Sequence, residues 1–159
     1  MGESKIETIE NWIDYFDEFN NESPRGAVII AAAFLDAQLQ KLIENHFIND
    51  KLANQETFDK NGSLSSFYAK IQIAYCLGLI SKEIRHDLNM IRKIRNNFAH
   101  EMFELSFEDK GIIDLCNKLN TGKIPLDHIT KTPENTFRVS TAILISNLGI
   151  KVEESTNKS

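Results

Sequence analysis

Residues 81–100 read SKEIRHDLNMIRKIRNNFAH, and this stretch indicates the fold class. Its large apolar side chains recur at intervals of three and four residues, which places them along one side of an α-helix. Ser81 stands just before them, and a serine there caps the free N–H groups of a first helical turn. The pattern therefore predicts a helix from Ser81 to His100 whose buried side carries Ile84, Leu88, Ile91, Ile94 and Phe98.

The same rhythm extends over most of the chain and predicts an all-α fold. Proline after Ser23 and after Thr132 marks two helix starts, because proline loses nothing at the first helical position. The polar segment 49–62 is expected to be a loop with at most one helical turn. We expect a compact bundle of about five to seven helices. Besides 81–100, they are predicted at 5–19, from Pro24 to about His46, at 64–79, from the Ser106 cap to Leu119, and from Pro133 to about Gly149.

Length and composition indicate a single domain. With 159 residues, 42% of them hydrophobic, the chain can fill one core. We expect residues 1–152 to form the domain and the polar residues 153–159 to be a flexible tail. The longest apolar run, Gly26 to Leu35, is shorter than the roughly 20 residues that span a bilayer. The N-terminus lacks the apolar region of a signal peptide, so we expect no membrane association and a cytoplasmic location.

Two cysteines are too few for a disulfide framework. Cys76 and Cys116 each lie in an apolar helical stretch and are interpreted as buried, reduced thiols. The histidines are scattered without the spacing of metal ligands. No metal site and no cofactor are expected.

Charge is unevenly distributed along the chain. The formal net charge of −5 argues against a protein that wraps duplex DNA over its whole surface. Residues 81–100, by contrast, carry five cations and two carboxylates, a net charge of +3, which leaves −8 for the remainder. Cations near a helix C-terminus also stabilise the helix dipole, which is a structural explanation for the cluster. The five cations are Lys82, Arg85, Arg92, Lys93 and Arg95.

The end of this helix combines arginine, asparagine and histidine. Asn96 and His100 are four residues apart and share a side of the helix with Arg92, whereas Arg95 is rotated by about 140° from His100. An imidazole beside guanidinium groups can cleave a phosphodiester without a metal. His100 would take the proton of a 2′-hydroxyl, Arg95 would stabilise the phosphate charge, and the Asn96 amide would orient the imidazole or a phosphate oxygen.

A structural interpretation of the same residues stays open. Arg95 can cap carbonyl groups or pair with an acid such as Asp36, which leaves His100 as a helix-end residue. Asp36 lies in an apolar helix, where a carboxylate is expected to pair with a cation such as Arg25 or Arg95. The cations Arg92, Lys93 and Arg95 are candidates for binding phosphate or nucleic acid, and Asp36 and Arg25 for supporting them.

Several short elements, in order, resemble the mannitol operon repressor family. They are the segment GSLSSFYAKIQIAYCLGLI at 62–80, the pattern Asp87-Leu-x-x-Ile-Arg-x-Ile-Arg-Asn-x-Phe-Ala-His100, and Leu105-Ser-Phe107. Arg25-Gly26 and the alanine-rich helix through Leu35 resemble the N-terminal half of that family. The resemblance implies an all-helical regulator of transcription that lacks a recognised DNA-reading motif.

Arg95-Asn96-x-x-x-His100 is also similar to the signature of HEPN domains. That resemblance implies a helical bundle that dimerises and, in many members, cleaves RNA without metal at a cleft shared by two protomers. His100 would then be the base, Arg95 the phosphate ligand and Asn96 the supporting residue.

Three functions remain open from the sequence. The chain can be a non-enzymatic regulator that binds a protein or an operator, a metal-independent endoribonuclease, or a protein that binds RNA or nucleotides without turnover. Apolar side chains on many short helices favour a homodimer.

Overall fold

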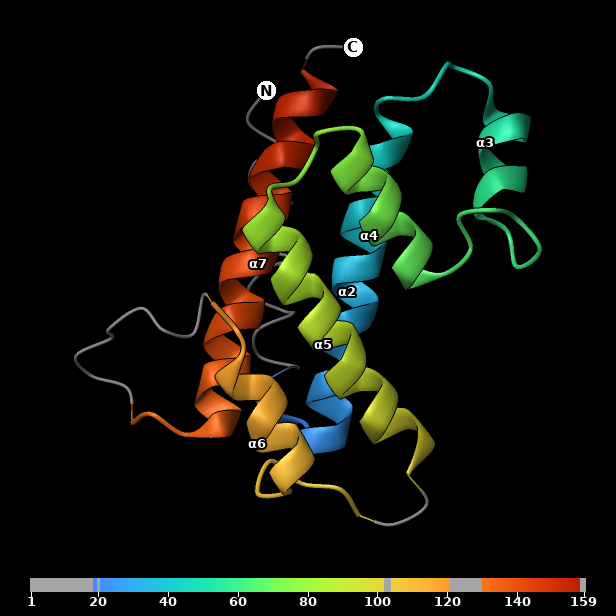
Figure 1. Cartoon of the computed structure of the whole chain (residues 1–159). Coiled ribbons are helices and arrows are strands. Elements are labelled where there is room, and N and C mark those ends of the chain that lie inside the picture. Colours follow the sequence, from blue (N-terminus) through green and yellow to red (C-terminus); the bar gives the residue numbers. More distant parts are fainter. Residues whose placement is uncertain (1–18, 20, 102–103, 121–129, 158–159) are drawn as a thin grey trace.

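The computed structural model describes residues 19, 21–101, 104–120 and 130–157. Within these residues every regular element is a helix, which confirms the all-α prediction (Figure 1). The helix predicted over 5–19 lies outside the described residues except for Phe19, which is buried. The six described helices are α2 (Pro24–Glu44), α3 (Lys51–Phe58), α4 (Phe67–Cys76), α5 (Lys82–His100), α6 (Lys110–Asn117) and α7 (Pro133–Thr156).

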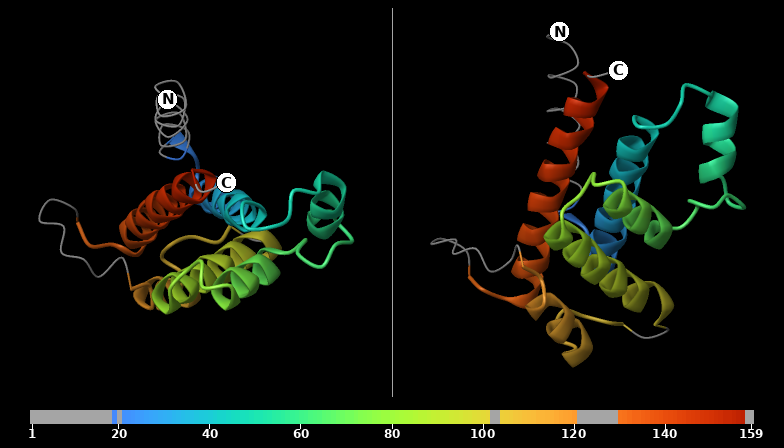
Figure 2. Two further views of the ribbon diagram at one scale, coloured as in Figure 1. Left: turned by 90° about the horizontal axis from the view of Figure 1, so that it is seen from above. Right: turned by 45° about the horizontal axis from the view of Figure 1, so that its top comes forward.

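The helices form two layers, seen from above in the left view of Figure 2. α2 and α7 lie side by side in one layer, and α4, α5 and α6 form the other. α2 packs against α7, α5 and α4, and α5 packs against α2, α4, α6 and α7, so these two helices join the layers at the centre of the bundle. α3 lies to one side of the bundle (Figure 1).

Small side chains allow α2 to sit close to its neighbours. Ala27, Ala31 and Ala32 are all buried, together with the larger Leu35 and Leu39 further along the helix. α2 is the one described helix whose length and hydropathy would suffice to cross a bilayer. In the bundle, three other helices cover it, and its apolar side forms the protein core.

Three phenylalanine rings, from α5, from the segment before α6 and from α7, pack in a row in the core. The Phe98 and Phe107 ring centres are 5.5 Å apart, and those of Phe107 and Phe137 are 5.4 Å apart. Tilted rings at this separation are a favourable aromatic arrangement. The row joins the end of α5 to the start of α7 through the segment before α6.

Side-chain caps begin α2, α5 and α7 as expected, whereas the predicted starts of α4 and α6 are wrong. Ser23, Ser81 and Thr132 each accept a hydrogen bond from the backbone N–H three residues on. α4, however, begins after Ser66, whose hydroxyl accepts from the N–H of Ala69, and not after Ser63. Residues 63–66 thus precede the helix that was predicted to start at 64. Ser106 does not cap a helix: α6 begins at Lys110 after Asp109, which makes no side-chain capping bond, and the Ser106 hydroxyl donates to the Asp109 Oδ2 at 3.1 Å.

α4 ends two residues before a glycine, Gly78, that sets the path to α5. Gly78 has a φ of +71°, a conformation that residues with a Cβ rarely adopt. The Leu79 N–H donates to the Ala74 carbonyl and the Gly78 N–H to the Tyr75 carbonyl, both at 2.9 Å. These two bonds are the Schellman pattern that terminates a helix.

Two helices are longer than the sequence predicts. The segment 49–62 contains α3, whose start is capped by the Asp50 carboxylate. α7 continues through Thr156, beyond its predicted end near Gly149, so residues 153–156 are helical. Asn45, at the end of α2, explains the extension: its Nδ2 donates to Ser155 Oγ at 2.8 Å and to Thr156 Oγ1 at 3.0 Å.

The two cysteines differ in their surroundings. Cys116 is buried in α6, and burial raises the pKa of its thiol to about 12. Cys76, the last residue of α4, is exposed, which corrects the interpretation of both as buried thiols. A helix end that faces solvent, and not the apolar composition around it, determines the exposure of Cys76.

Candidate functional site

The candidate site lies on the last two turns of α5. The Arg95 Nη1 donates a hydrogen bond to the Asn96 Oδ1 at 3.1 Å. Arg95 is exposed and Asn96 is half-buried. Among the described residues Arg95 has no carboxylate within ion-pair distance. The asparagine therefore orients a guanidinium whose positive charge faces solvent.

His100 is exposed at the end of the same helix. α5 stays regular to this residue, and the Glu101 N–H still donates to the Asn97 carbonyl at 3.2 Å. No hydrogen bond links His100 to Arg95 or Asn96 within the part of the chain that the structure describes. The helix thus brings Arg95 and Asn96 together and leaves the imidazole separate, one turn beyond Asn96.

Arg25, from α2, holds the end of α5. Its Nε donates to the Phe98 carbonyl at 2.8 Å and its Nη2 to the Glu101 carbonyl at 2.7 Å. Carbonyl groups at a helix C-terminus lack partners within the helix. A guanidinium that binds the carbonyls of Phe98, in the last turn, and of the C-cap residue Glu101 therefore stabilises the end of α5. The carbonyl-capping role that one interpretation gave to Arg95 therefore belongs to Arg25.

Asp36 is not part of this site. Its Oδ2 forms an ion pair with the Lys70 Nζ at 2.9 Å, so the predicted pairing with Arg25 or Arg95 is wrong. Lys70 is buried in α4, with 4% of its side chain exposed, and its Nζ lies 6.0 Å from the centre of the Phe58 ring. The pair links α2 to α4 inside the bundle.

The remaining predicted cations point in different directions. Lys93 is exposed, whereas Arg92 is half-buried and its guanidinium lies over the Tyr68 ring of α4. Arg85 lies over the Tyr75 ring in the same way. Neither tyrosine was predicted from the sequence to contact the basic helix. The available signal was an equal spacing of seven residues between the two tyrosines and between the two arginines.

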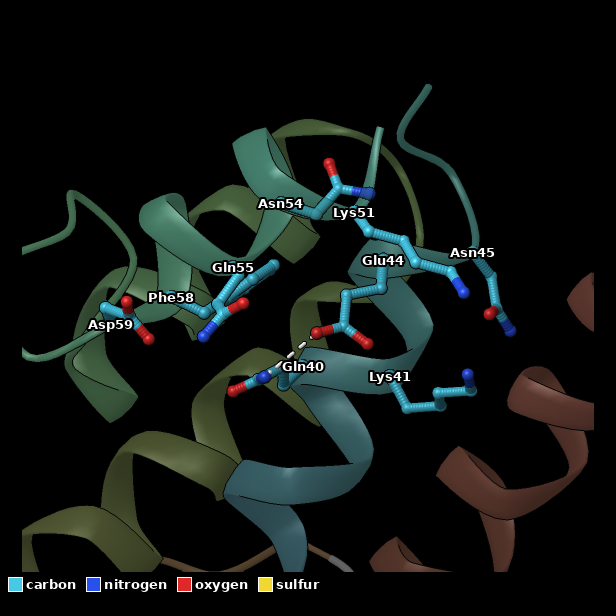
Figure 3. Close-up of a pocket in the computed structure, with 9 residues that line it drawn as sticks. All are labelled: Gln40, Lys41, Glu44, Asn45, Lys51, Asn54, Gln55, Phe58 and Asp59. Carbon is cyan, nitrogen blue, oxygen red and sulfur yellow. Dashed lines mark hydrogen bonds between the residues drawn. The ribbon is translucent and has the colours of Figure 1, made fainter. Parts of the chain in front are cut away.

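A hollow of about 470 Å³ opens elsewhere, between the C-terminal half of α2 and α3 (Figure 3). Its lining carries two lysines, Lys41 and Lys51, and two carboxylates, Glu44 and Asp59. The Gln40 Nε2 donates to Glu44 Oε1 at 2.9 Å. The opposite charges balance, so this hollow offers no net attraction to a charged ligand.

Metal binding has no candidate residues in the described ranges. No group of three or more His, Cys, Asp and Glu side chains there is placed to hold an ion. The chemistry that the site can offer is therefore that of its own groups: guanidinium hydrogen bonding, an amide that orients it, and an exposed imidazole.

Comparison with solved structures first places the chain in a class of helical bundles. The structure of the MtlR–HPr complex from Escherichia coli matches with a TM-score of 0.70 and 19% identity, over 85% of this chain and 96% of that chain. A possible transcriptional regulator, YggD from Shigella flexneri 2a, matches with a TM-score of 0.65 and 12% identity, over 87% of this chain and 95% of that chain. No curated protein sequence matches this chain.

The sequence itself identifies the family. Residues 15–145 match the family model described as the mannitol repressor, MtlR. The matched range includes α2 to α6 and the first half of α7. This chain belongs to the mannitol repressor family, as the resemblance of its short sequence elements implied.

Proposed function

We propose that this chain is a regulator of transcription that works in the cytoplasm by binding another protein, without a helix-turn-helix reader. Its membership of the mannitol repressor family carries the proposal. The similar E. coli MtlR was solved in complex with the protein HPr, which makes HPr the first partner to test. The net charge of −5 supports the same view, because a protein that binds DNA by itself normally neutralises phosphates with an excess of cations.

Calorimetric titration of the full chain with HPr from the same genome tests the proposal. We expect saturable binding, and the same affinity with the His100→Ala variant, because a regulator of this kind needs no general base. Ubiquitin serves as the control for nonspecific binding. No heat of binding with HPr at concentrations up to about 100 μM, a range that covers micromolar affinities, would contradict the proposal.

As a second candidate we propose a metal-independent endoribonuclease of the HEPN kind. The hydrogen bond from Arg95 to Asn96 favours it, because this bond orients a guanidinium that has no ion-pair partner among the described residues, one turn before His100. His100 would act as the base and Arg95 as the phosphate ligand. Arg92 and Lys93 would add positive charge along the path of the RNA backbone.

Cleavage of a structured RNA in excess EDTA separates the two candidates. A ribonuclease gives product with wild type, and loses at least 100-fold in rate with His100→Ala, because general base catalysis typically contributes about 10²–10⁴-fold. RNA that is bound but never cut, with salt-dependent affinity lost in Arg92→Ala and Arg95→Ala, would indicate binding without turnover. Equal absence of product from wild type and His100→Ala removes the enzyme proposal.

We further propose that the chain forms a homodimer. Large apolar side chains remain exposed at Ile48, Leu52 and Ile150, which lie before α3, within α3 and near the end of α7. Contact between copies would remove such surface from water. Light scattering of the full chain measures the mass directly, and a monomer at all concentrations would contradict the dimer.

A further inference from the structure

The outer side of α4 and α5 carries two repeated arginine–tyrosine pairs. The Arg85 guanidinium carbon lies 4.7 Å from the centre of the Tyr75 ring, and that of Arg92 lies 5.1 Å from the centre of the Tyr68 ring. The two helices run antiparallel, so the seven-residue spacing on each brings both pairs into contact. Tyr68 and Tyr75 are 50% and 36% exposed, and no other described helix covers this side in Figure 2.

Hydrogen bonds fix the orientation of both guanidinium groups. The Arg85 Nε donates to the Gln72 Oε1 at 2.9 Å, and the Arg92 Nε donates to the Asn89 Oδ1 at 3.4 Å. The Asn89 Nδ2 in turn donates to the Arg85 carbonyl at 3.0 Å. Within the described residues, the inner nitrogen of each arginine is therefore occupied and no hydrogen bond involves its two terminal nitrogens, which leaves them for an external acceptor.

These arginines lack a negative partner in the described ranges. The ion pairs there join Lys70 to Asp36 and Arg138 to Glu134, and neither involves the α4–α5 face. Two acids share the helix with the arginines. Asp87 is buried and accepts from the Asn120 N–H, and Glu83 lies in the first turn of α5, where backbone and Ser81 hydrogen bonds lower its pKa. The face is thus positive and its charge is not neutralised by its own carboxylates.

The geometry favours carboxylates over nucleotide bases as the groups that bind here. A guanidinium presents its two terminal N–H groups in parallel, which matches the two oxygens of a carboxylate. Each tyrosine ring already has a guanidinium on one face, so the rings offer less surface for base stacking. Arginine and tyrosine held in fixed positions are also the residue types that dominate protein–protein binding energy.

We propose that this face, defined by Tyr68, Gln72, Tyr75, Arg85 and Arg92, docks an acidic segment of a partner protein. Seven residues of helix separate the two arginines by about 10 Å, so the segment presents two carboxylates at that distance. On a partner helix those carboxylates are seven residues apart. The proposal rests on the proposed function, since it assumes that the chain works by binding a protein, and adds the surface and the chemistry of its partner.

Two fluorescent helical peptides of identical composition test the spacing. One carries its two glutamates seven residues apart, on one side of the helix, and the other nine apart, on opposite sides. Anisotropy titrations with the full chain are expected to give at least tenfold tighter binding of the first peptide. Arg85→Gln and Arg92→Gln are each expected to weaken it about tenfold, the loss typical of an interface residue worth just over 1 kcal/mol.

Lys41→Gln and Lys51→Gln provide matched controls, because each removes one exposed positive charge from the α2–α3 hollow. Both are expected to keep wild-type affinity within twofold. Thermal unfolding of every variant checks that the bundle is intact.

Three results would overturn the proposal. They are equal affinity for the two peptides, an equal loss in the lysine controls, and tighter binding of a single-stranded oligouridine through Arg85 and Arg92.

The HPr titration separates this inference from the proposed function. If HPr binds wild type, Arg85→Gln and Arg92→Gln equally, the docking surface is wrong and the function stands. If the spaced peptide binds through both arginines but HPr does not bind, the docking surface stands and the proposed function, tested with HPr as the partner, is contradicted.

Discussion

Positive charges on the inner and outer sides of α4 have different surroundings. On the inner side, Lys70 is buried and its ammonium group contacts the Asp36 carboxylate. On the outer side, Arg85 and Arg92 contact tyrosine rings and have no carboxylate partner among the described residues. A charge away from water needs a counter-charge in the protein, whereas an exposed one is solvated. The inner cation therefore serves the fold, and the outer cations are available to a partner.

Removal of the inner cation is expected to have the largest effect. Lys70→Met leaves Asp36 without its partner, and its Oδ1 already lacks one within the described residues. We expect a loss of about 2 kcal/mol in the free energy of unfolding, less than for a fully buried pair because the Asp36 side chain is 31% exposed. Urea denaturation measures it. The double variant Asp36→Leu/Lys70→Met should recover at least half of the loss, because it removes both charges. A single variant as stable as wild type would contradict the structural role of the pair.

Arg25 lies between the two cases, since it is exposed but binds two backbone carbonyls. Arg25→Ala is expected to lower the free energy of unfolding by about 1.5 kcal/mol, the usual contribution of hydrogen bonds to a charged group. The loss should appear locally as faster amide exchange in the last turn of α5. Arg25→Lys keeps the charge but not the forked geometry and should recover only part of the protection. Unchanged exchange in both variants would show that the turn does not need this contact.

The outer arginines are expected to contribute little to stability. Arg85→Gln and Arg92→Gln each remove a partly exposed cation–π contact worth about 0.5–1 kcal/mol. Thermal unfolding should therefore change by only a few degrees in either variant. A loss as large as that of Lys70→Met would mean that the outer pairs hold the fold together, and would remove the contrast between the two sides.

The two cysteines show the same contrast between an exposed and a buried side chain. Their reactivity can be measured without changing the stability of the protein. Cys76 is exposed, whereas burial raises the pKa of Cys116 to about 12, so the reactive thiolate of Cys116 is scarce at pH 8. An aromatic disulfide reagent should label one thiol quickly in the native chain and two in urea. Cys76→Ser should abolish the fast phase. Fast labelling of two thiols in the native wild type would place Cys116 at the surface.

Local sequence patterns were enough to predict α5, because its apolar stripe and the Ser81 cap are both encoded within it. α3 was missed because none of its residues is buried, so it has no apolar stripe to detect. The end of α7 was placed too early because residues 153–156 depend on Asn45, more than 100 positions away in the sequence.

The candidate site likewise has contacts that the local sequence predicts and contacts that depend on the packing of helices. The contact of Arg95 with Asn96 joins neighbours on one helix, and its residues were identified from the sequence. The partner of Asp36 was not, because several cations were available and only the packing of α4 on α2 selects Lys70. The tyrosine–arginine pairs likewise depend on how α4 and α5 are aligned, which no single helix encodes.

The turn after α4 has a consequence for how such a surface can change. Tyr75 and Arg85 are equidistant from Ile80 in the sequence, and so are Tyr68 and Arg92. The Gly78 termination fixes where the chain reverses, and thereby which residue of α5 lies opposite each residue of α4. One residue inserted between Gly78 and Ser81 would shift every cross-helix pair at once. The length of this one short turn therefore sets which residues of α4 and α5 pair across the whole face. A change in that length would alter the binding specificity of the face in one step, whereas side-chain substitutions alter one pair at a time.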